Sequence, residues 1–241
     1  MTILALTLDL DDTLWPLMPT LLRAEQAMHV WLAEHAPRTA RLHGIEAMRA
    51  LRAETGRRHP ALAHDLSQLR LLSLRDALRA AGDDPALAEP AFERFFSERQ
   101  RVDFYDEVVD ALERLSSRYR LLAVSNGNAD LAATGLSRWF TGSVSAQKAG
   151  VAKPDRRIFE QACAALACAP DAVMHVGDDH AADIIGARAA GLHTAWLRRE
   201  PAQAGRLEVA TDAPPGHHWV VGDLGVLADH LLADRVLADP R

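Results

Sequence analysis

Long apolar runs are missing from this 241-residue chain, and no stretch approaches the roughly 18 consecutive apolar residues of a membrane span. No basic segment precedes the first apolar run, as one would in a secretory leader. Acidic residues outnumber basic ones, 33 against 27, and the net charge of -6 argues against binding along the phosphates of a nucleic acid. We therefore expect a cytoplasmic protein without a membrane or nucleic-acid partner.

Cysteine is also scarce. The chain has two cysteines, Cys163 and Cys168, and they lack the paired spacing of a zinc site. We interpret them as free buried thiols. The chain length allows one large domain, or one domain with an insertion.

Short apolar runs of β type recur along the chain, and helical patterns separate the later ones. The β-type runs cover residues 3–8, 121–124, 173–176 and 194–197, with a weaker one at 142–146. The helical patterns cover residues 107–116, 129–136, 154–166 and 181–190. Strands that alternate with helices of this length predict an α/β fold with a parallel sheet covered on both faces.

Residues 15–101 follow a different pattern. They contain no convincing strand and indicate about four helices, which are broken near residues 35–37, 56–60 and 82–85. Within them an amphipathic stripe of leucines predicts a helix, formed by Leu66, Leu69, Leu72, Leu74 and Leu78. We therefore predict an all-helical domain inserted after the first strand, with residues 1–14 and 102–241 forming the α/β domain.

The last part of the chain adds three short elements. Residues 211–216 contain two prolines and are expected to form a connecting loop. A strand is predicted at 218–221, and Asp223 is placed to cap a final helix.

Two carboxylates follow the first apolar run. Asp9 and Asp11 stand two positions apart where that strand is expected to end. Ligands bind at the carboxyl ends of strands in an open parallel sheet, and side chains at i and i+2 point to the same side of an extended segment. Two carboxylates this close repel each other unless a cation joins them or one binds a proton. The pair therefore predicts a divalent metal site.

Polar residues also follow the second β-type run and precede a helix further on. Ser125 and Asn126 offer a hydroxyl and N–H donors suited to a phosphate oxygen, although such residues are also ordinary turn formers. Lys153 stands before a helix whose first turn accepts Pro154, which would hold the lysine in a fixed loop. A lone lysine at such a place is most often a solvated charge.

A fourth polar cluster follows residues 173–176. Asp178, Asp179 and Asp183 lie within six positions, and their mutual repulsion has to be offset by a metal or a lysine. Asp179 has a second interpretation, as the cap of the next helix. For Asp178 the metal-binding interpretation is favoured.

Taken in this order, the four clusters resemble the motifs of the haloacid dehalogenase superfamily. The matching residues are Asp9, Asp11 and Thr13 of the pattern DxDxT, Ser125, Lys153, and Gly177, Asp178 and Asp183 of the pattern GDxxxxD. The resemblance covers essentially the whole chain. It implies a Rossmann-like three-layer core and identifies residues 15–101 as a helical cap domain inserted after the first strand.

Within that superfamily the likeness narrows. Residues 8–14, 125–128, 175–179 and 195–198 resemble bacterial phosphatases that act on flavin mononucleotide and on the ribitylaminouracil phosphate of riboflavin synthesis. This resemblance implies a Mg²⁺-dependent phosphomonoesterase whose partner is a small phosphorylated metabolite. We expect a monomer or a homodimer.

The resemblance also implies a division of roles. Asp9 would be the nucleophile that forms an aspartyl phosphate, and Asp11 would be the general acid and base. The carboxylates of Asp9 and Asp178 and the main-chain carbonyl of Asp11 would hold Mg²⁺. The hydroxyl of Ser125, the main-chain N–H of Asn126 and the ammonium group of Lys153 would bind phosphate.

Two further residues would support this site. Asp183 would hold the outer shell of the metal or orient Lys153. Thr13 would brace the loop that carries the aspartates. Asp12 is assigned a loop or structural role.

Asp11 separates two reactions of the superfamily. Dehalogenases need a nucleophilic aspartate but as a family lack an aspartate two residues further on, so Asp11 favours a phosphatase. The alternatives are a phosphoglycolate or sugar-phosphate phosphatase, a phosphomutase, and a non-catalytic ligand-binding protein on the same fold. The non-catalytic alternative predicts a missing nucleophile, acid or metal ligand, and none is missing.

A few side chains keep two interpretations. Trp15 could contact substrate or pack at the hinge of the cap. Arg70 and Arg75 could reach an anionic or planar ligand, but arginines on amphipathic helices are usually solvated, and we favour that interpretation. His180 could touch substrate or solvent, and residues 217–218 are expected in a surface loop.

Overall fold

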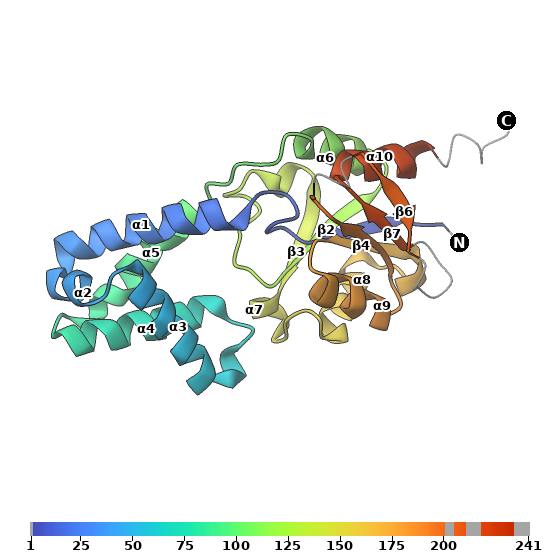
Figure 1. Ribbon diagram of the computed structural model, residues 1–241. Helices are drawn as coiled ribbons and strands as arrows, with labels where there is room; N and C mark the ends of the chain where they lie inside the picture. The colour runs from blue at the N-terminus through green and yellow to red at the C-terminus, as the bar shows by residue number, and fades with distance from the viewer. Residues whose placement is uncertain (1, 201–204, 211–217, 234–241) are drawn as a thin grey trace, which may run out of the picture. The chain divides into compact units, whose positions relative to one another are not determined.

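A computed structural model of the protein describes residues 2–200, 205–210 and 218–233, and the chain divides into two compact units. The α/β unit comprises Met1–Pro16, Phe104–Gly127 and Gly135–Arg241. The helical unit comprises Leu17–Asp103 and Asn128–Thr134 (Figure 1). The two boundaries at which the chain enters and leaves the helical unit lie two residues later than the sequence predicts. Residues 128–134 also belong to the helical unit.

A seven-stranded sheet forms the centre of the α/β unit. Its strands are β1 (Ala5–Leu8), β2 (Arg120–Ser125), β3 (Phe140–Ser145), β4 (Val173–Gly177), β5 (His193–Leu197), β6 (Leu207–Val209) and β7 (His218–Val221). They are arranged in the order β3-β2-β1-β4-β5-β7-β6, and every pair is parallel except β6 with β7. The predicted parallel sheet is confirmed, and the short antiparallel edge strand β6 was not predicted.

Strand β1 is the point where the order of the strands reverses. It pairs with β2 on one side and with β4 on the other, so that Leu8 lies opposite Ala123 and Val176. In open α/β sheets ligands bind at the carboxyl edge beside such a switch point. The residues that follow β1, β2 and β4 therefore meet at one edge of the sheet.

Helices cover both faces of this sheet, as predicted. Helices α6 (Val108–Ser116) and α10 (Leu224–Ala233) lie over one face, and α8 (Arg156–Leu166) and α9 (Gly186–Ala189) over the other (Figure 1). The apolar face of α8 packs on β1, β2 and β4 in a buried cluster that includes Ile158, Phe159 and Val124. Asp223 caps α10 by accepting a hydrogen bond from the N–H of Val226 at 2.8 Å, which confirms its predicted role.

Three helical predictions are wrong in detail. Residues 129–135 form turns and irregular backbone rather than an α-helix, and Leu136 begins a short 3-10 helix (Leu136–Arg138). The side chain of Asp130 accepts hydrogen bonds from the N–H groups of Ala132 and Ala133, which favours the turn. Helix α8 begins two residues later than predicted, because Asp155 is its N-cap and Pro154 lies outside it. Residues 180–185 form a single π-helical segment that continues into α9.

Two further expectations concern the end of the sheet and the thiols. His218 is buried in β7, where its Nδ1 and the Thr194 hydroxyl are 3.0 Å apart, so its assignment to a surface loop was wrong. The predicted loop at 211–216 and His217 lie outside the described residues. Cys163 and Cys168 are free thiols, but only Cys163 is buried, as predicted for both, and burial raises its pKa to about 11. Cys168 is partly exposed.

Five α-helices make up most of the helical unit. They are α1 (Leu17–His35), α2 (Pro37–Leu42), α3 (Ile45–Arg58), α4 (Leu66–Ala81) and α5 (Ala88–Arg99). Helix α1 packs on α5, and α4 packs on α3 and α5 around a core that includes Leu32, Leu74 and Phe95. Of the predicted leucine stripe of α4, Leu74 and Leu78 belong to this core and Leu69 is buried. Leu72 is only partly buried and Leu66 is about half exposed.

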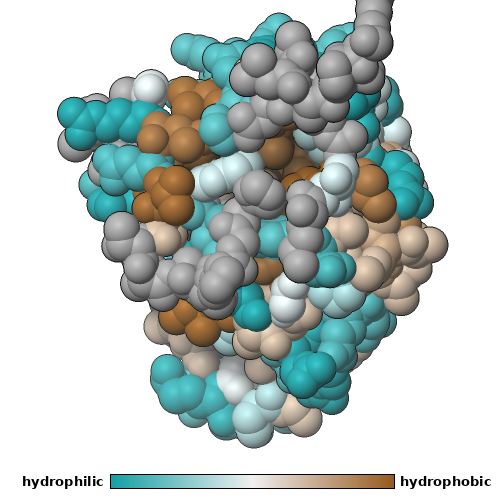
Figure 2. Space-filling model, turned by 90° about the vertical axis from the view of Figure 1, so that its right-hand side faces the viewer, coloured by the Kyte–Doolittle hydropathy of each residue, from teal (hydrophilic) through white to brown (hydrophobic). Residues whose placement is uncertain are grey.

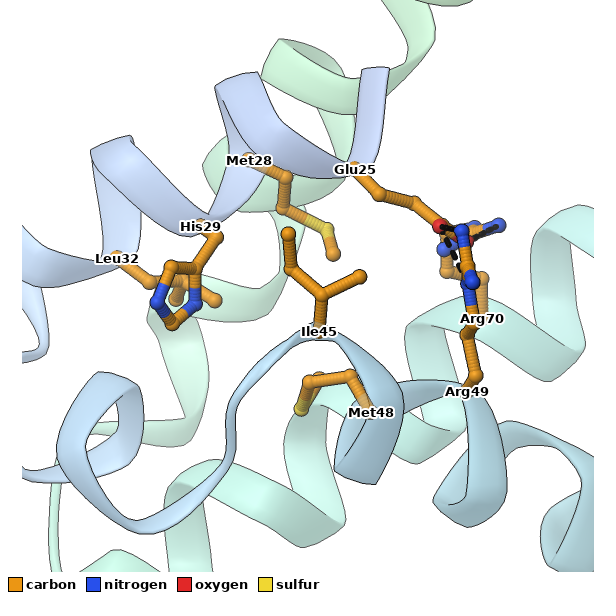
Figure 3. A pocket seen from close by; sticks show the side chains of 8 residues that line it. All are labelled: Glu25, Met28, His29, Leu32, Ile45, Met48, Arg49 and Arg70. Atoms are coloured by element: carbon orange, nitrogen blue, oxygen red, sulfur yellow. Dashed lines mark hydrogen bonds and ion pairs between the residues drawn. The ribbon is translucent and has the colours of Figure 1, made fainter. Parts of the chain in front are cut away.

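A group of charges is buried inside the helical unit. Figure 3 shows Glu25 of α1 pointing toward Arg49 of α3 and Arg70 of α4, beside His29 and the apolar side chains that line the rest of the pocket. The ion pairs measure 2.6 Å to Arg49 and 3.6 Å to Arg70, and the guanidinium of Arg70 lies 3.6 Å over the ring of Phe95. Burial, and then the charge of Arg52, lower the pKa of Arg70.

Arg70 is therefore a structural residue of the helical core, and its assignment to a solvated face was wrong. Its side chain is 8% exposed and meets the carboxylate of Glu25. Arg75 is 31% exposed and forms an ion pair with Glu89. The two arginines of α4 thus differ in burial and in partner.

Replacing Glu25 with glutamine should destabilise the helical unit. The substitution keeps the shape of the side chain but leaves two buried or half-buried arginines without their shared carboxylate. Breaking a buried ion pair in this way costs about 3 to 5 kcal/mol. The free energy of unfolding, measured by urea titration, should fall by that amount, whereas Glu46→Gln, which removes an exposed partner of Arg49, should change it by less than about 1 kcal/mol. Equal effects of the two substitutions would contradict this account of the cluster.

The surface of the described residues is mixed in character. On the face in Figure 2 the apolar residues form separate groups among hydrophilic ones. The large apolar side chains exposed in the α/β unit come from separate parts of the chain and are Leu4 before β1, Val109 in α6, Ile185 in the π-helical segment and Val209 in β6. Single exposed apolar residues of this kind are ordinary on a protein surface. No helix in the described part of the chain is long and apolar enough to cross a membrane.

Candidate active site

The loop after β1 carries Asp9 and Asp11 at the edge of the sheet. The N–H of Asp9 continues the ladder by donating to the carbonyl of Val176 at 2.9 Å, and its side chain is almost buried. A tight turn follows, in which Asp12 adopts a left-handed backbone with φ of 57°. Short polar residues tolerate this conformation better than others do, which fits the structural role assigned to Asp12.

Three carboxylates converge in front of β1 and β4. Asp9, Asp178 and Asp183 each place an oxygen within 4.8 Å of the others. Burial raises the pKa of Asp9 to about 8 and that of Asp178 to about 6, and the charge of Asp183 acts in the same direction on both. The side chain of Asp11 is outside this cluster and accepts a hydrogen bond from the indole N–H of Trp15 at 2.9 Å.

Lys153 bridges two of the three carboxylates. Its ammonium group lies 2.5 Å from an oxygen of Asp9 and 2.6 Å from an oxygen of Asp183, and its side chain is 3% exposed. Burial opposes the charge of the lysine, but the charges of Asp9 and Asp183 outweigh burial and raise the pKa of Lys153. The general expectation of a solvated lysine therefore does not hold here, and Lys153 is a buried cation beside Asp9.

Both carboxylate oxygens of Asp183 are used within the protein. One oxygen meets Lys153 and lies 3.0 Å from the His175 ring, and the other accepts a hydrogen bond from the N–H of Asp179 at 3.1 Å. Burial alone would raise the pKa of Asp183, but Lys153 and His175 hold it well below its ordinary value. Gly177 allows this approach, because a Cβ at that position would lie 2.3 Å from Asp183 Cγ.

His175 continues this network into the interior of the sheet. Its Nδ1 lies 2.9 Å from the Thr7 hydroxyl and its Nε2 lies 3.0 Å from Asp183. An ionised Asp183 only accepts hydrogen bonds, so Nε2 donates to it and Nδ1 accepts from Thr7. Burial lowers the pKa of His175 and keeps the ring neutral. No role was predicted for His175 from the sequence, although a histidine in a buried apolar strand is a signal, because its ring nitrogens need partners.

Ser125 and Asn126 follow β2, as predicted. The Ser125 oxygen accepts a hydrogen bond from the N–H of Gly127 at 2.9 Å, which leaves the hydroxyl proton free to be donated elsewhere. The Asn126 side chain accepts from the N–H of Lys153 at 2.7 Å and donates to its carbonyl at 3.0 Å. The loops after β2 and before α8 are therefore tied together beside Asp9.

Thr13 and Asp179 support the same edge. The Thr13 hydroxyl donates to the carboxylate of Asp178 at 3.1 Å, so it does more than brace its own loop. Asp179 is exposed and accepts from the N–H groups of Ala181 and Ala182, which favours its helix-capping interpretation.

Aromatic residues lie beside Asp178. The indole N–H of Trp196 donates to the main-chain carbonyl of Asp178 at 2.8 Å, and the ring of exposed His180 lies 4.5 Å from that of Trp196. A hollow of about 300 Å³ opens between Asp178, Trp196 and Tyr105 in the α/β unit. His180 therefore lies beside Trp196 at this hollow and is outside the carboxylate cluster.

The donor set fits a hard divalent cation. Asp9 and Asp178 offer carboxylate oxygens, the ligands that Mg²⁺ prefers, and burial raises the pKa of both groups, so a cation would relieve their repulsion. The oxygens of Asp183 already have protein partners, which suits a supporting role. The role of the Asp11 carbonyl stays a prediction.

A family model of the haloacid dehalogenase-like hydrolases matches residues 3–191. Together with the sheet order and the carboxylates at its edge, this match places the chain in that family, and the chain is a haloacid dehalogenase-like hydrolase.

Several relatives of the chain are named phosphatases. The chain is 32% identical over 200 residues to the 5-amino-6-(5-phospho-D-ribitylamino)uracil phosphatase YigB of Escherichia coli, covering 81% of this chain and 84% of that protein. It is 35% identical over 145 residues to the phosphoserine phosphatase of Thermus thermophilus, covering 58% of each. Within its family the chain is a hydrolase of phosphate monoesters.

A solved structure of different name is also similar. The 2-haloacid dehalogenase from Pseudomonas syringae pv. Tomato superposes with a TM-score of 0.83 at 33% identity, covering 97% of this chain and 99% of that one. The likeness confirms the Rossmann-like fold. The interpretation of Asp11 as evidence for a phosphatase rather than a dehalogenase stays a prediction from the resemblance.

Proposed function

We propose that the protein is a Mg²⁺-dependent phosphomonoesterase that works through an aspartyl phosphate on Asp9. The observation that carries this proposal is the placement of Asp9 at the switch point of the sheet. There it faces the buried ammonium group of Lys153 and the carboxylate of Asp178. A nucleophilic carboxylate flanked by cationic charge suits attack on a phosphoryl group, because negative charge there is offset in advance.

In the first half-reaction, Asp9 would attack the phosphorus atom of the ester. The Ser125 hydroxyl and the main-chain N–H of Asn126 would donate to phosphate oxygens, and Lys153 would offset their charge. Asp11 would give its proton to the leaving oxygen, so that an alcohol departs. Mg²⁺, held by Asp9, Asp178 and the Asp11 carbonyl, would neutralise charge on the phosphoryl group.

In the second half-reaction, Asp11 would be a base. As a carboxylate it would remove a proton from the water that attacks the phosphorus atom of the aspartyl phosphate. Phosphate would leave and Asp9 would be regenerated. Asp183, held by His175, would keep Lys153 in place through both halves.

For the substrate we propose a small phosphorylated metabolite, with ribitylaminouracil phosphate or flavin mononucleotide as the first candidates. Support comes from the relative YigB, which is named for ribitylaminouracil phosphate and shares 32% identity over most of both chains.

A panel of phosphate esters tests this function. We expect ribitylaminouracil phosphate and flavin mononucleotide to give the highest kcat/KM, ahead of phosphoserine, phosphoglycolate and sugar phosphates. Chelation of Mg²⁺ should lower kcat/KM by about 100-fold or more, and added Mg²⁺ should restore it.

Each arm of this panel can fail separately. Activity undiminished by the chelator would contradict the requirement for Mg²⁺. If sugar phosphates gave the same kcat/KM as ribitylaminouracil phosphate and flavin mononucleotide, the proposed substrates would be wrong. Halide release from 2-chloropropionate is the control reaction, and none is expected. An isomerised sugar phosphate without release of phosphate would indicate a phosphomutase instead.

A further inference from the structure

Trp15 is buried within the α/β unit next to the proposed general acid. Its side chain has no exposed surface, and its indole N–H donates to Asp11 Oδ1 at 2.9 Å. Its own carbonyl accepts the N–H of Asp12 at 2.8 Å, which closes the turn between the two residues. The ring also meets the edge of Phe104, with centroids 5.8 Å apart.

This hydrogen bond restricts the carboxylate of Asp11. Tryptophan has a single polar side-chain atom, which is a donor, and a buried donor without a partner costs about 1 to 3 kcal/mol. The ring has little room to turn to another acceptor, because it is fully buried and packs against Phe104, and the main chain that carries it is closed into a turn by the bond from Asp12. The bond to Oδ1 therefore limits the rotamers that the partly buried Asp11 side chain can adopt.

We propose that Trp15 is a positioning residue for leaving-group protonation. The indole N–H occupies Oδ1 of Asp11, so the transferable proton of the acid resides on Oδ2. This inference rests on the proposed function, in which Asp11 is the acid and base. Of the two interpretations of Trp15 drawn from the sequence, full burial argues against contact with substrate, whereas packing at the hinge agrees with its contact to Phe104, to which the indole N–H adds a polar role.

Bonds and protons balance in the transfer of the phosphoryl group to Asp9. The bond from Asp9 to phosphorus forms as the bond to the leaving oxygen breaks, and the proton of Asp11 Oδ2 moves to that oxygen. Asp11 becomes a carboxylate whose charge the indole N–H stabilises. The proton returns from the attacking water in the second half-reaction.

The variant Trp15→Phe removes the N–H and keeps an aromatic ring. Acid catalysis matters most for a strongly basic leaving group, so kcat/KM for phenyl phosphate should fall by about 10-fold or more. For p-nitrophenyl phosphate, whose leaving group needs little protonation, kcat/KM should fall by less than about threefold. Because kcat/KM covers only the steps up to the first phosphoryl transfer, the comparison isolates the role of the acid.

Trp219→Phe is the matched control. Trp219 is also nearly buried in the α/β unit, but it packs on His230 of α10 rather than on Asp11. This control should affect the two esters equally. Equal fold-changes for the two esters in Trp15→Phe would overturn the inference. A wild-type protein that turns over neither ester, or an Asp9→Ala variant that turns over both at the wild-type rate, would instead contradict the proposed function.

A second measurement works even if Trp15→Phe does not fold. The indole N–H resonances of the five tryptophans can be assigned by NMR, and Asp11→Ala should shift that of Trp15 while leaving the other four in place. An unmoved Trp15 resonance would overturn the inference.

In an Asp11→Asn background, Trp15→Phe should change kcat/KM for phenyl phosphate by less than about twofold, because the acid it positions is absent.

Discussion

Replacing Asp9 with asparagine is expected to lower phosphatase kcat at least about 1000-fold while the protein stays folded. The amide is a poor nucleophile, so the aspartyl phosphate would not form. Stability should not fall. Folding raises the pKa of Asp9, so at neutral pH ionisation of this carboxyl group favours the unfolded chain over the metal-free folded protein, and asparagine removes that cost. Lys153 keeps its partner Asp183 at 2.6 Å. Turnover of p-nitrophenyl phosphate and chemical denaturation without Mg²⁺ measure the two effects.

The control for this variant is Asp12→Asn. Asp12 neighbours the same site but has a left-handed backbone that asparagine also tolerates, and we assign it a structural role. Its kcat should remain within about threefold of wild type. If Asp9→Asn kept near-normal turnover, the nucleophile would have to be another residue.

Replacing Gly177 with alanine adds one methyl group, and we expect it to lower stability more than any other such addition at the site. A Cβ there would lie 2.3 Å from Asp183 Cγ and 2.7 Å from its Cβ, far inside contact distance. Asp183 would have to move, and Lys153 and His175 would lose the carboxylate they share. We expect the free energy of unfolding to fall by about 3 kcal/mol or more, with kcat falling at the same time.

Gly142→Ala provides the comparison within the same sheet. A Cβ at Gly142 in β3 would meet its nearest atom, Leu122 Cδ1, at 3.5 Å, which is an ordinary contact. Its unfolding free energy should change by less than about 1 kcal/mol. A Gly177→Ala protein as stable and active as Gly142→Ala would mean that Asp183 does not need its observed position.

The sheet could be predicted from the sequence because its central strands are buried on both faces. Such strands appear as continuous apolar runs, and the polar residues just after them mark the edge where ligands bind. Strand β6 escaped prediction because its three residues are largely exposed at the end of the sheet. Residues 129–136 have a helical composition, but the side chain of Asp130 satisfies the local N–H groups in a turn.

At the site, the sequence identified the residues of the motifs but not what connects them. Motif spacing led to Asp9, Ser125, Lys153 and Asp178. The bond from Trp15 to Asp11 and the one from His175 to Asp183 depend on side-chain directions that no spacing encodes. Arg70 shows the same limit, since helical periodicity did not reveal that Glu25 of α1 lies across from it.

The paired hydrogen bonds between the Asn126 side chain and the main chain of Lys153 have a thermodynamic consequence. They join two segments 27 positions apart in the chain through both the N–H and the carbonyl of one residue. The conformational entropy of bringing these segments together is lost during folding, so an arriving anion does not have to order them. The rigidity acquired in folding therefore contributes to affinity for the ligand. The Asn126 side chain makes this contribution through its bonds to the main chain of Lys153 and does not have to touch the ligand.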